Sequence, residues 1–425
     1  MTSALDRRIK ITIIFTHHIR WVPFELFATY IDKRRFDVDY VILGETDPMV
    51  SFLLEKGIPV LTTTFDDYNK TPEAVKFVYD HLMRRRPDIV QTHWFAGSLI
   101  GMQAAYYANI PVRIFHREHP PLRYYNRHPA SKHQLIWDCA THLIAVTAAS
   151  KAGMVEDGIP ADQITVIPTG FNIDEFLNVQ PATVERLKQK YLNTDQLKQR
   201  GPVIGVAARY VKWKGVEYMI HAFKKVLAEH PQALLILSGG HVDRALVMAK
   251  MKAASSADVV AHQYDDVLSI YDCLSELPDG SYLEIPFEQD LYALFKLFDV
   301  FVHVPIDSVQ ETFGQVYVEA MLAKIPSVIT MSGSAIDHAV HRENAWIVDY
   351  ANSDQIAEGV LTLLSDHSLR GTIIQNAFAC AQERYEISKQ MHTLEEFYVQ
   401  ALASSLPDHS HSRLSMPNKG ASGEP

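Results

Sequence analysis

Residues 300–324 read VFVHVPIDSVQETFGQVYVEAMLAK, and this stretch decides the fold. It begins with an apolar run, Val300–Val304, and passes through a polar loop. The segment Gly314–Lys324 then carries an apolar stripe at helical spacing, and a second apolar run, Ser327–Met331, follows. A strand, a helix and a second strand in succession are typical of a parallel pair, because parallel strands need a long crossover connection. The stretch therefore predicts a β-α-β unit in a parallel sheet.

The same alternation of short apolar runs and helical patterns covers most of the chain. Further expected strands are Lys10–Phe15, Asp39–Leu43, Ile89–Thr92, Val112–His116, Leu143–Val146, Thr165–Ile167, Val203–Ala207 and Ala233–Ser238. Near-continuous apolar strands between helices predict an α/β protein with parallel sheets covered on both faces.

The chain is long enough for two domains. Its 425 residues exceed what one compact core usually holds. The polar stretch Asn178–Pro202 is interpreted as the connection between the domains, and residues 255–280, with uneven polarity, as an insertion. We expect a first domain at 1–190, a second at 191–384, a helix at 385–404 that packs back on the first domain, and a disordered tail at 405–425.

Composition narrows the class of protein. Hydrophobic residues make up 47% of the chain and charged residues 21%, as in folded globular proteins. The net charge of −10 disfavours a basic surface, so we expect no nucleic-acid partner. Three scattered cysteines, and an apolar run Ile9–Phe15 too short for a secretory signal, predict a cytoplasmic protein. We expect no transmembrane helix, while composition leaves contact with the inner face of a membrane open.

Polar side chains gather where the expected strands end. They are His17 and His18, His93, the segment 116–119, Arg209 and the segment 305–311. Ligands of open parallel sheets bind beyond the carboxyl ends of the strands. If the two sheets face each other through these ends, the polar groups line one cleft between the domains.

The segment Glu311–Glu319 contains the strongest local signal. We expect Gly314 to open a helix, whose free amides up to Val316 suit a phosphate group. Glu319 lies beside the apolar stripe of that helix, and a buried carboxylate needs donors such as sugar hydroxyls. Spacing alone leaves open a second interpretation, in which a neighbouring arginine satisfies a half-buried Glu319.

The loop after the expected strand Val203–Ala207 contains a second signal. Arg209 and Lys214 flank this loop and can converge on a diphosphate, Arg209 as a fork and Lys214 as a point charge. Gly215 allows a close approach of the backbone at the start of the next helix. The two basic residues predict an anion site in an otherwise acidic protein.

Together these motifs resemble the retaining glycosyltransferases of the GT-B type, in particular the nucleotide-sugar-dependent family 4. Glu311 and Glu319 match the E-x7-E signature of that family, and Arg209 with Lys214 and Gly215 matches its R-x4-K-G loop. Two further segments are similar to family segments in the same order: ITVIPTGFNIDEF at 164–176, and the stretch 90–119 with its two histidines.

The resemblance covers about residues 9–400 and implies two Rossmann-like, doubly wound domains that face each other across a cleft. It implies transfer of a sugar from a nucleoside-diphosphate sugar to a hydroxyl of a carbohydrate or lipid-linked acceptor, without a metal or cofactor. The implied donor-side residues are Arg209, Lys214, Glu311, Phe313, Gly314, Gln315, Val316 and Glu319.

The resemblance also implies roles for individual residues. Arg209 and Lys214 would hold the donor diphosphate, Glu311 the transferred sugar and Glu319 the ribose. His93 would lie near the reacting centre, so that Arg209, Lys214, Glu311 and His93 form the implied catalytic set. The implied acceptor side consists of His17, His18, His93 and His119.

The sequence departs from the family pattern in two loops, and three alternatives stay open. His17-His18 stands where family members often carry a glycine pair, and Asp337 stands where they carry a glutamate. Twenty histidines raise the alternative of a metal centre, but their spacing fits no compact ligand motif and we expect none. The other two alternatives are a non-catalytic module that binds a nucleotide sugar and a nucleotide-sugar epimerase on the same fold.

Overall fold

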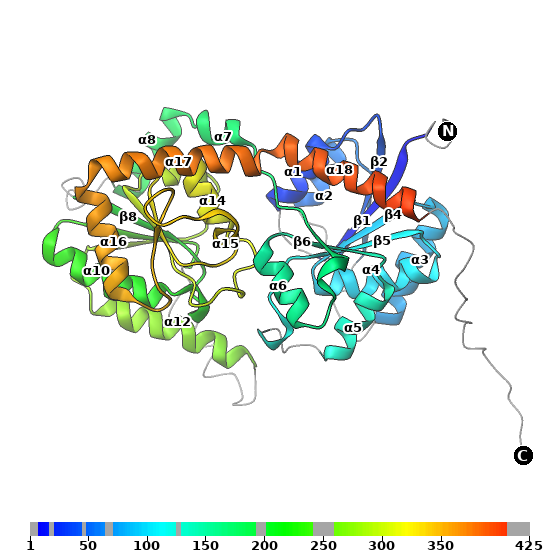
Figure 1. Ribbon diagram of the computed structural model, residues 1–425, viewed down its shortest axis with the longest axis horizontal. Helices are drawn as coiled ribbons and strands as arrows, with labels where there is room; N and C mark the ends of the chain where they lie inside the picture. Colours follow the sequence, from blue (N-terminus) through cyan, green and yellow to red (C-terminus); the bar gives the residue numbers. More distant parts are fainter. Residues whose placement is uncertain are drawn as a thin grey trace, which may run out of the picture.

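The computed structural model describes residues 7–16, 21–44, 48–63, 71–124, 129–192, 201–240 and 259–405. Two parallel sheets lie side by side, and each has helices on both faces (Figure 1). Apolar side chains between the sheets and their helices form the core. The α/β class predicted by the alternating pattern is confirmed.

Within these residues the first sheet has seven strands, in the spatial order β3-β2-β1-β4-β5-β6-β7. The strands are β1 (Ile9–Phe15), β2 (Phe36–Leu43), β3 (Val60–Thr63), β4 (Ile89–His93), β5 (Val112–Arg117), β6 (His142–Ala145) and β7 (Ile164–Val166). The helices are α1 (Val22–Tyr30), α2 (Pro48–Glu55), α3 (Thr71–Arg85), α4 (Phe95–Tyr107), α5 (Ala130–Cys139) and α6 (Ala148–Glu156). The strand order reverses between β1 and β4, where ligands of such sheets bind.

The second sheet has six strands in the described part of the chain, in the order β10-β9-β8-β11-β12-β13. They are β8 (Val203–Ala207), β9 (Leu234–Ser238), β10 (Tyr282–Ile285), β11 (Val300–His303), β12 (Ser327–Ile329) and β13 (Trp346–Ile347). The surrounding helices are α7 (Ile173–Leu177), α8 (Pro181–Leu192), α10 (Val216–Glu229), α12 (Val259–Ser275), α13 (Leu291–Phe295), α14 (Gln315–Leu322), α15 (Ala335–His338) and α16 (Ser353–Ser365). This order reverses between β8 and β11, so both domains are doubly wound.

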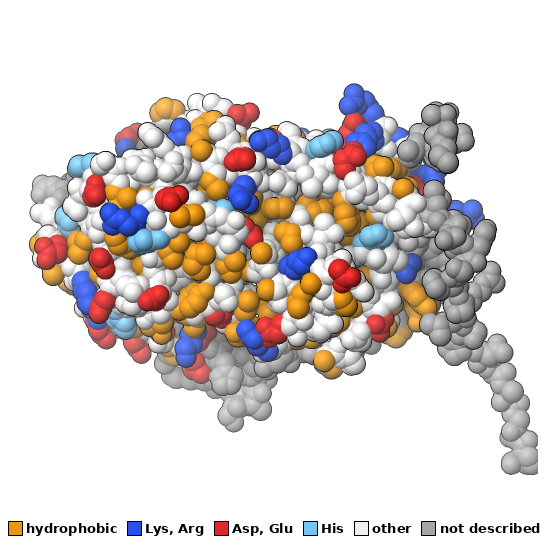
Figure 2. All heavy atoms as spheres, viewed as in Figure 1, with side chains coloured by type: hydrophobic (Ala, Val, Ile, Leu, Met, Phe, Trp, Pro, Cys, Tyr) orange, Lys and Arg blue, Asp and Glu red, His pale blue; other side chains and the backbone are white. Residues whose placement is uncertain are grey.

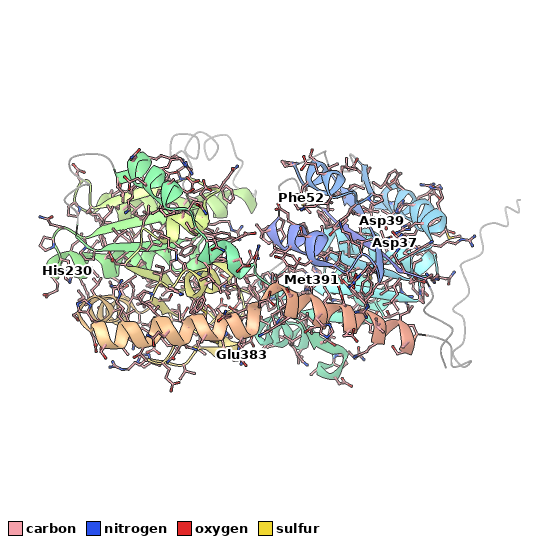
Figure 3. All side chains as sticks on the ribbon, turned by 90° about the horizontal axis from the view of Figure 1, so that it is seen from above. Asp37, Asp39, Phe52, His230, Glu383 and Met391 are labelled. Atoms are coloured by element: carbon pink, nitrogen blue, oxygen red, sulfur yellow. The ribbon has the colours of Figure 1, made fainter. Side chains whose placement is uncertain are left out.

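Two consecutive helices join the domains along one side of the molecule. α17 (His367–Tyr385) covers the second domain, and α18 (Ile387–Ser404) continues across to the first, as Figures 1 and 3 show. Apolar side chains of α18, among them Met391 and Tyr398, belong to the same core cluster as strands β1 and β2. Most of the expected tail at 405–425 lies outside the described residues.

Two boundaries differ from the sequence interpretation. The chain crosses to the second domain before α7, because side chains of α7 and α8 such as Phe176 and Leu187 lie in the core of the second sheet. Side chains of α7 and α8 thus contribute to the core around the second sheet. Much of the segment 255–280, interpreted as an insertion, is the helix α12, whose apolar side chains Ile270 and Leu274 pack in the second-domain core.

The surface carries charges of both signs. On the face that Figure 2 shows, basic and acidic side chains are interspersed over both domains. Among the described residues, no helix combines the length and apolar character that crossing a membrane requires.

Candidate active site

The two strand-order reversals face the space between the domains. β4 ends at His93 in the first sheet, β8 leads to Arg209, and β11 leads to the loop that carries Glu311. These strands are the ones beside which each strand order reverses. The carboxyl ends of the two sheets therefore place their polar residues at one location.

A cleft between the domains gathers most of the predicted donor-side residues. The second domain contributes Arg209, Trp213, Lys214 and residues 310–316, and the first domain contributes Trp21, Trp94 and Glu118. Seven of the eight predicted donor-side residues thus line one cleft, the exception being Glu319.

Lys214 and Glu311 form an ion pair in the wall of this cleft, and each side chain is about nine-tenths buried. His303, at the end of β11, places its Nε2 3.3 Å from the same carboxylate. Burial alone would raise the pKa of Glu311, but Lys214 and His303 outweigh it and bring the pKa to about 2. The Lys214 Nζ also lies 4.4 Å from the ring centre of Trp213, a cation–π contact. The cleft therefore contains a fixed cation and a fixed anion.

Two glycines with positive φ allow the loops in this wall to pack. Gly215 has φ 69°, and a Cβ there would lie 2.0 Å from the carbonyl oxygen of Val304. Gly314 has φ 77°, and a Cβ there would lie 3.4 Å from Cγ of Glu311. Gly215 thus brings the end of the Lys214 loop against the end of β11, which leads to Glu311.

Positive potential in the cleft has two further sources. The first amide of α14 with a backbone acceptor is that of Tyr317, which donates to Gly314 at 3.0 Å. The amides of Gln315 and Val316 precede it, and such helix amino ends attract anions. Arg209 is exposed, and no carboxylate among the described residues forms an ion pair with it. These groups and Lys214 can together hold a diphosphate.

Glu319 lies in the second turn of α14, outside the residues that line the cleft. Its Oε2 is buried, and in the described part of the chain no hydrogen-bond partner reaches it. The neighbouring arginine of the second sequence interpretation is therefore absent from the described residues. Burial raises the pKa of Glu319 to about 7. An ionised carboxylate buried in this way destabilises the folded protein unless hydrogen-bond donors reach it.

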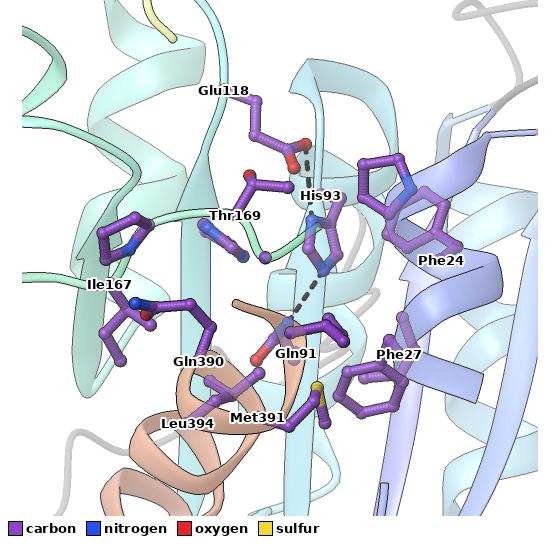
Figure 4. A pocket seen from close by; sticks show the side chains of 16 residues that line it. Phe24, Phe27, Gln91, His93, Glu118, Ile167, Thr169, Gln390, Met391 and Leu394 are labelled. Atoms are coloured by element: carbon purple, nitrogen blue, oxygen red, sulfur yellow. Dashed lines mark hydrogen bonds and ion pairs between the residues drawn. The ribbon is translucent and has the colours of Figure 1, made fainter. Parts of the chain in front are cut away.

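A second pocket adjoins the cleft on the side of the first domain (Figure 4). Most of its wall is apolar and comes from α1, α18 and the segment 167–170 that leaves the first domain. Glu118 lines both the pocket and the cleft, so the two meet there. The polar end of the pocket carries Gln91, His93, His116 and Glu118.

His93 is buried and contacts a partner through each ring nitrogen. Nδ1 lies 3.3 Å from Oε2 of Glu118, and Nε2 lies 2.8 Å from the side-chain nitrogen of Gln91. Phe24 packs edge-on against the ring, with centroids 4.8 Å apart. The ring of His116 lies 4.8 Å away, and burial, more than the neighbouring His93, lowers the pKa of His116 to about 4. His116 is therefore neutral at neutral pH.

The remaining predicted residues lie elsewhere. His119 is buried with its ring 5.5 Å from that of His133, and it lines neither the cleft nor the pocket. The ring of Phe313 is buried and stacks on Phe171 in the core, so its contribution to the cleft comes from the loop it anchors. The pair His17-His18 lies outside the described residues.

Hydrogen bonds through Thr147 and Thr312, which the sequence did not single out, connect the domains beside the cleft. The Thr147 hydroxyl donates to the Thr312 carbonyl at 2.6 Å, and the Thr312 hydroxyl donates to the Glu118 carbonyl at 3.2 Å. The Ala148 amide donates to Asp337 at 3.1 Å. Asp337, in a loop where the sequence departs from the family pattern, thus contacts the amino end of α6. A threonine between a strand and a helix is a capping signal, but capping does not indicate a partner in another domain.

Two groups of side chains have the composition of a cation site. His93, His116 and Glu118 each offer one ligand atom, and these atoms lie within 4.8 Å of one another. Zinc accepts this combination of ligands. The cluster comes from the ends of β4 and β5, so the spacing of the histidines along the sequence does not indicate it.

The second group is an Asp-x-Asp pair in β2, Asp37 and Asp39, which Figure 3 labels in the first domain. Arg85 donates to both carboxylates, at 2.9 and 3.2 Å. Asp39 also contacts His81 Nε2 at 2.7 Å and accepts from the Thr12 hydroxyl at 2.7 Å. Internal partners thus occupy this pair, so it does not fit a metal.

Comparison with known families agrees with this arrangement. The family described as Glycosyltransferase Family 4 matches residues 24–175, and the family described as Glycosyl transferases group 1 matches residues 281–379. The chain belongs to the group 1 and family 4 glycosyltransferases. It is therefore a transferase enzyme.

The chain is similar to the capsular polysaccharide biosynthesis glycosyltransferase CapM of Staphylococcus aureus. The two are 26% identical over 324 residues, which cover 74% of this chain and 77% of the relative.

Solved structures share the fold. The Anabaena protein Alr3699/HepE, in complex with UDP-glucose, matches with a TM-score of 0.72 and 21% identity, over 92% of this chain and 100% of that one. The UDP-GlcNAc 2-epimerase of Neisseria meningitidis matches with a TM-score of 0.59 and 15% identity, over 92% of this chain and 100% of the epimerase. The two-domain GT-B fold expected from the sequence is thus confirmed.

Proposed function

We propose that this glycosyltransferase moves a sugar from a nucleoside-diphosphate sugar to a hydroxyl acceptor, with retention of anomeric configuration and without a divalent metal at the diphosphate. One observation carries the proposal. Arg209, Lys214 and the amino end of α14 line a single cleft between the domains. Fixed positive charge and free amides at one place suit a leaving diphosphate.

The chemistry needs stabilisation of charge more than it needs a reactive side chain. When the glycosyl–phosphate bond breaks, positive charge develops on the sugar and negative charge on the diphosphate. Glu311 and Trp213 already hold Lys214 in place, so its charge acts without reorganisation. In this proposal Lys214 and Arg209 do what a divalent cation does in other transferases. Glu319 supplies a buried acceptor for the ribose hydroxyls.

We place the acceptor on the side of the pocket, near His93 and Glu118. An acceptor hydroxyl that attacks from the face of the leaving group retains the anomeric configuration. The complex of the Anabaena protein with UDP-glucose supports a UDP-hexose donor for this chain. The Staphylococcus aureus relative, named for capsular polysaccharide biosynthesis, supports a carbohydrate or lipid-linked acceptor. We propose that the reaction takes place in the cytoplasm, including the inner face of the membrane.

The test is to incubate the full chain with UDP-, GDP- and ADP-sugars and a panel of hydroxyl acceptors, and to follow the anomeric protons by NMR. A parallel reaction contains EDTA. We expect a glycoside with the anomeric configuration of the donor, formed equally fast with EDTA. An inverted product contradicts retention, and loss of activity in EDTA contradicts metal independence. An epimerised sugar nucleotide, or tight binding without any product across the panel, overturns the proposed transfer.

A further inference from the structure

Two buried hydrogen bonds and one ion-pair contact run from the last helix of the protein to the mouth of the cleft. The Tyr398 hydroxyl, on α18, donates to Oε1 of Gln91 at 2.8 Å. The side-chain nitrogen of Gln91 lies 2.8 Å from Nε2 of His93, and Nδ1 of His93 lies 3.3 Å from Glu118. Figure 4 shows the last two contacts as dashed lines. Tyr398, Gln91 and His93 are all at most 4% exposed.

The strand geometry explains how this chain of contacts arises. Gln91 and His93 are two residues apart in β4, so their side chains share one face of the sheet. The face with Gln91 is the one on which α18 packs, since Tyr398 reaches it across 307 positions of the sequence. A buried glutamine must satisfy both ends of its amide, and here Tyr398 and His93 do so.

The orientation of the Gln91 amide, with its oxygen toward Tyr398, assigns the proton to one nitrogen of His93. The Tyr398 hydroxyl donates to the amide oxygen of Gln91, so the amide nitrogen faces His93. An amide nitrogen can only donate, so Nε2 of His93 must accept. A neutral imidazole with Nε2 as acceptor carries its proton on Nδ1. Nδ1 is the ring nitrogen within ion-pair distance, 3.3 Å, of Oε2 of Glu118.

We propose that Gln91 and Tyr398 are positioning residues that hold His93 in its Nδ1–H tautomer, so that His93 orients Glu118 as a hydrogen-bond acceptor for a hydroxyl of the acceptor substrate. The inference deepens the proposed function and rests on it for the identity of the ligand. Glu118 lines both the cleft and the pocket, and an ionised carboxylate only accepts hydrogen bonds. The hydroxyls of a polyhydroxylated sugar can donate to such a carboxylate.

The same tautomer prevents the cluster of His93, His116 and Glu118 from binding a metal. A metal at these ligands needs the lone pair of the His93 nitrogen nearest to Glu118, which is Nδ1. In the Nδ1–H tautomer that lone pair is not available. Binding of a metal by this cluster and the proposed role of Gln91 thus exclude each other, so zinc serves as a probe.

The first experiment measures the tautomer directly. The full chain is labelled with 15N-histidine, and long-range 1H–15N correlations distinguish a proton on Nδ1 from one on Nε2. The signals of His93 are those lost in His93→Gln. We expect the proton on Nδ1 in the unmodified protein. A proton on Nε2 in that protein overturns the proposal, as does a Zn²⁺ titration that shifts the His93 signals at stoichiometric metal.

Two variants test the positioning residues. Gln91→Glu places a carboxylate oxygen beside Nε2, so we expect a proton to move onto that nitrogen. Tyr398→Phe releases the amide oxygen of Gln91 with little change in shape, so we expect both tautomers to appear. Tyr385→Phe, which removes another buried tyrosine hydroxyl in contact with His338, is the matched control and should leave the His93 signals unchanged. An unchanged His93 tautomer in both test variants overturns the proposal.

Kinetics separate this inference from the proposed function. In Gln91→Glu and Tyr398→Phe we expect kcat/KM for the acceptor to fall about tenfold, as for loss of one hydrogen bond to a charged group. The Kd of the donor, measured by calorimetry, should stay within twofold, because the diphosphate contacts lie on the second domain. Unchanged acceptor kinetics with a changed tautomer would contradict the role of Glu118. A chain without any transfer activity would contradict the proposed function, while the tautomer measurement would still decide the roles of Gln91 and Tyr398.

Discussion

The ion pair of Lys214 and Glu311 limits how the residues of the cleft can be tested. Removing one partner of a buried pair leaves the other charge uncompensated, at a cost of about 3–5 kcal/mol in the free energy of unfolding. A loss of activity in a Lys214 or Glu311 variant would therefore mix donor binding with damage to the loop. Arg209 is exposed and outside this pair, so its substitution reports on the ligand.

Arg209→Ala should weaken use of the donor by more than tenfold. The guanidinium can make charged hydrogen bonds to the diphosphate, each worth about 1.5–3 kcal/mol. The measurement is kcat/KM for the donor together with its Kd by calorimetry. Lys212→Ala is the control, because Lys212 is an exposed base in the same loop and does not line the cleft. Equal effects of the two substitutions would remove Arg209 from the donor site.

Glu319→Gln should change the dependence of stability on pH. The pKa of Glu319 is raised by burial to about 7, from 4.5 in the unfolded chain. Below 4.5 the group is protonated in both states and destabilises neither. Between about 4.5 and 7 the unfolded chain ionises while the folded state keeps the proton, so the wild type loses stability that Glu319→Gln keeps, and the loss is complete above pH 7. With about 1.4 kcal/mol for each pKa unit, the variant should gain roughly 2–3 kcal/mol over the wild type between pH 5 and pH 8.

Urea unfolding of the two proteins at both pH values measures this difference, because the other titrating groups cancel between them. A constant difference in the free energy of unfolding would show that Glu319 is not a buried, protonated carboxyl group. A saturating donor should remove part of the difference at pH 8 if ribose hydroxyls donate to the carboxylate.

Among the secondary-structure elements, those with a strong periodic signal were predicted best. The central strands β1, β4 and β8 lie within one residue of their expected bounds, because strands buried on both faces read as continuous apolar runs. β13 has two residues, too few for a pattern. The buried face of α17 consists of Ile373, Ala377, Ala381 and Tyr385. Because two of these four residues are alanines, the buried face is hardly more hydrophobic than the exposed face, and the sequence gives a weak helical signal.

The candidate site could be predicted only where topology brings strand ends together. Arg209 and Glu311 follow neighbouring strands of a doubly wound sheet, so their proximity follows from the alternating pattern. The contact of Tyr398 with Gln91 depends on how α18 packs across the first domain, and no local pattern encodes it. The available signal was Gln91 itself, a polar residue within an apolar strand, which needs a buried partner.

Gly215→Ala should damage the loop that carries Lys214 and thereby the donor site. Gly57→Ala is a matched control, since Gly57 has φ 71° against 69° for Gly215, but a Cβ at Gly57 would meet no atom within 4 Å. Both substitutions put an alanine in the left-handed conformation, which costs about 1–2 kcal/mol in the free energy of unfolding. Only at position 215 would the Cβ also lie 2.0 Å from a carbonyl, that of Val304.

We therefore expect Gly215→Ala to lower the Tm by more than Gly57→Ala does and to raise the Kd of the donor, which Gly57→Ala should leave unchanged. Thermal unfolding and calorimetry on both variants measure the two effects. An equal decrease of Tm in both variants would mean that the close packing of Gly215 against the end of β11 does not contribute to stability.

At the scale of the whole molecule, the described residues connect the domains both along one side and beside the cleft. Along one side α17 and α18 form a continuous helical connection, with a break only at Glu386 (Figure 1). Beside the cleft, the amino end of α6 makes hydrogen bonds to Thr312 and Asp337. Thr312 directly follows Glu311, so the second connection ties the relative position of the domains to the donor loop.

Thr147→Val should loosen this second connection without changing the shape of the side chain. The Thr147 hydroxyl donates to the Thr312 carbonyl at 2.6 Å and accepts from the Ser150 amide at 3.0 Å as the cap of α6. Loss of the cap costs about 1 kcal/mol of stability, and loss of the other bond frees the loop that carries Glu311. We expect the Kd of the donor to rise several-fold and the radius of gyration, measured by small-angle scattering, to increase. Thr147→Ser keeps the hydroxyl and should resemble the wild type in both measurements, so identical behaviour of the Val and Ser variants would show that the contact does not hold the domains together.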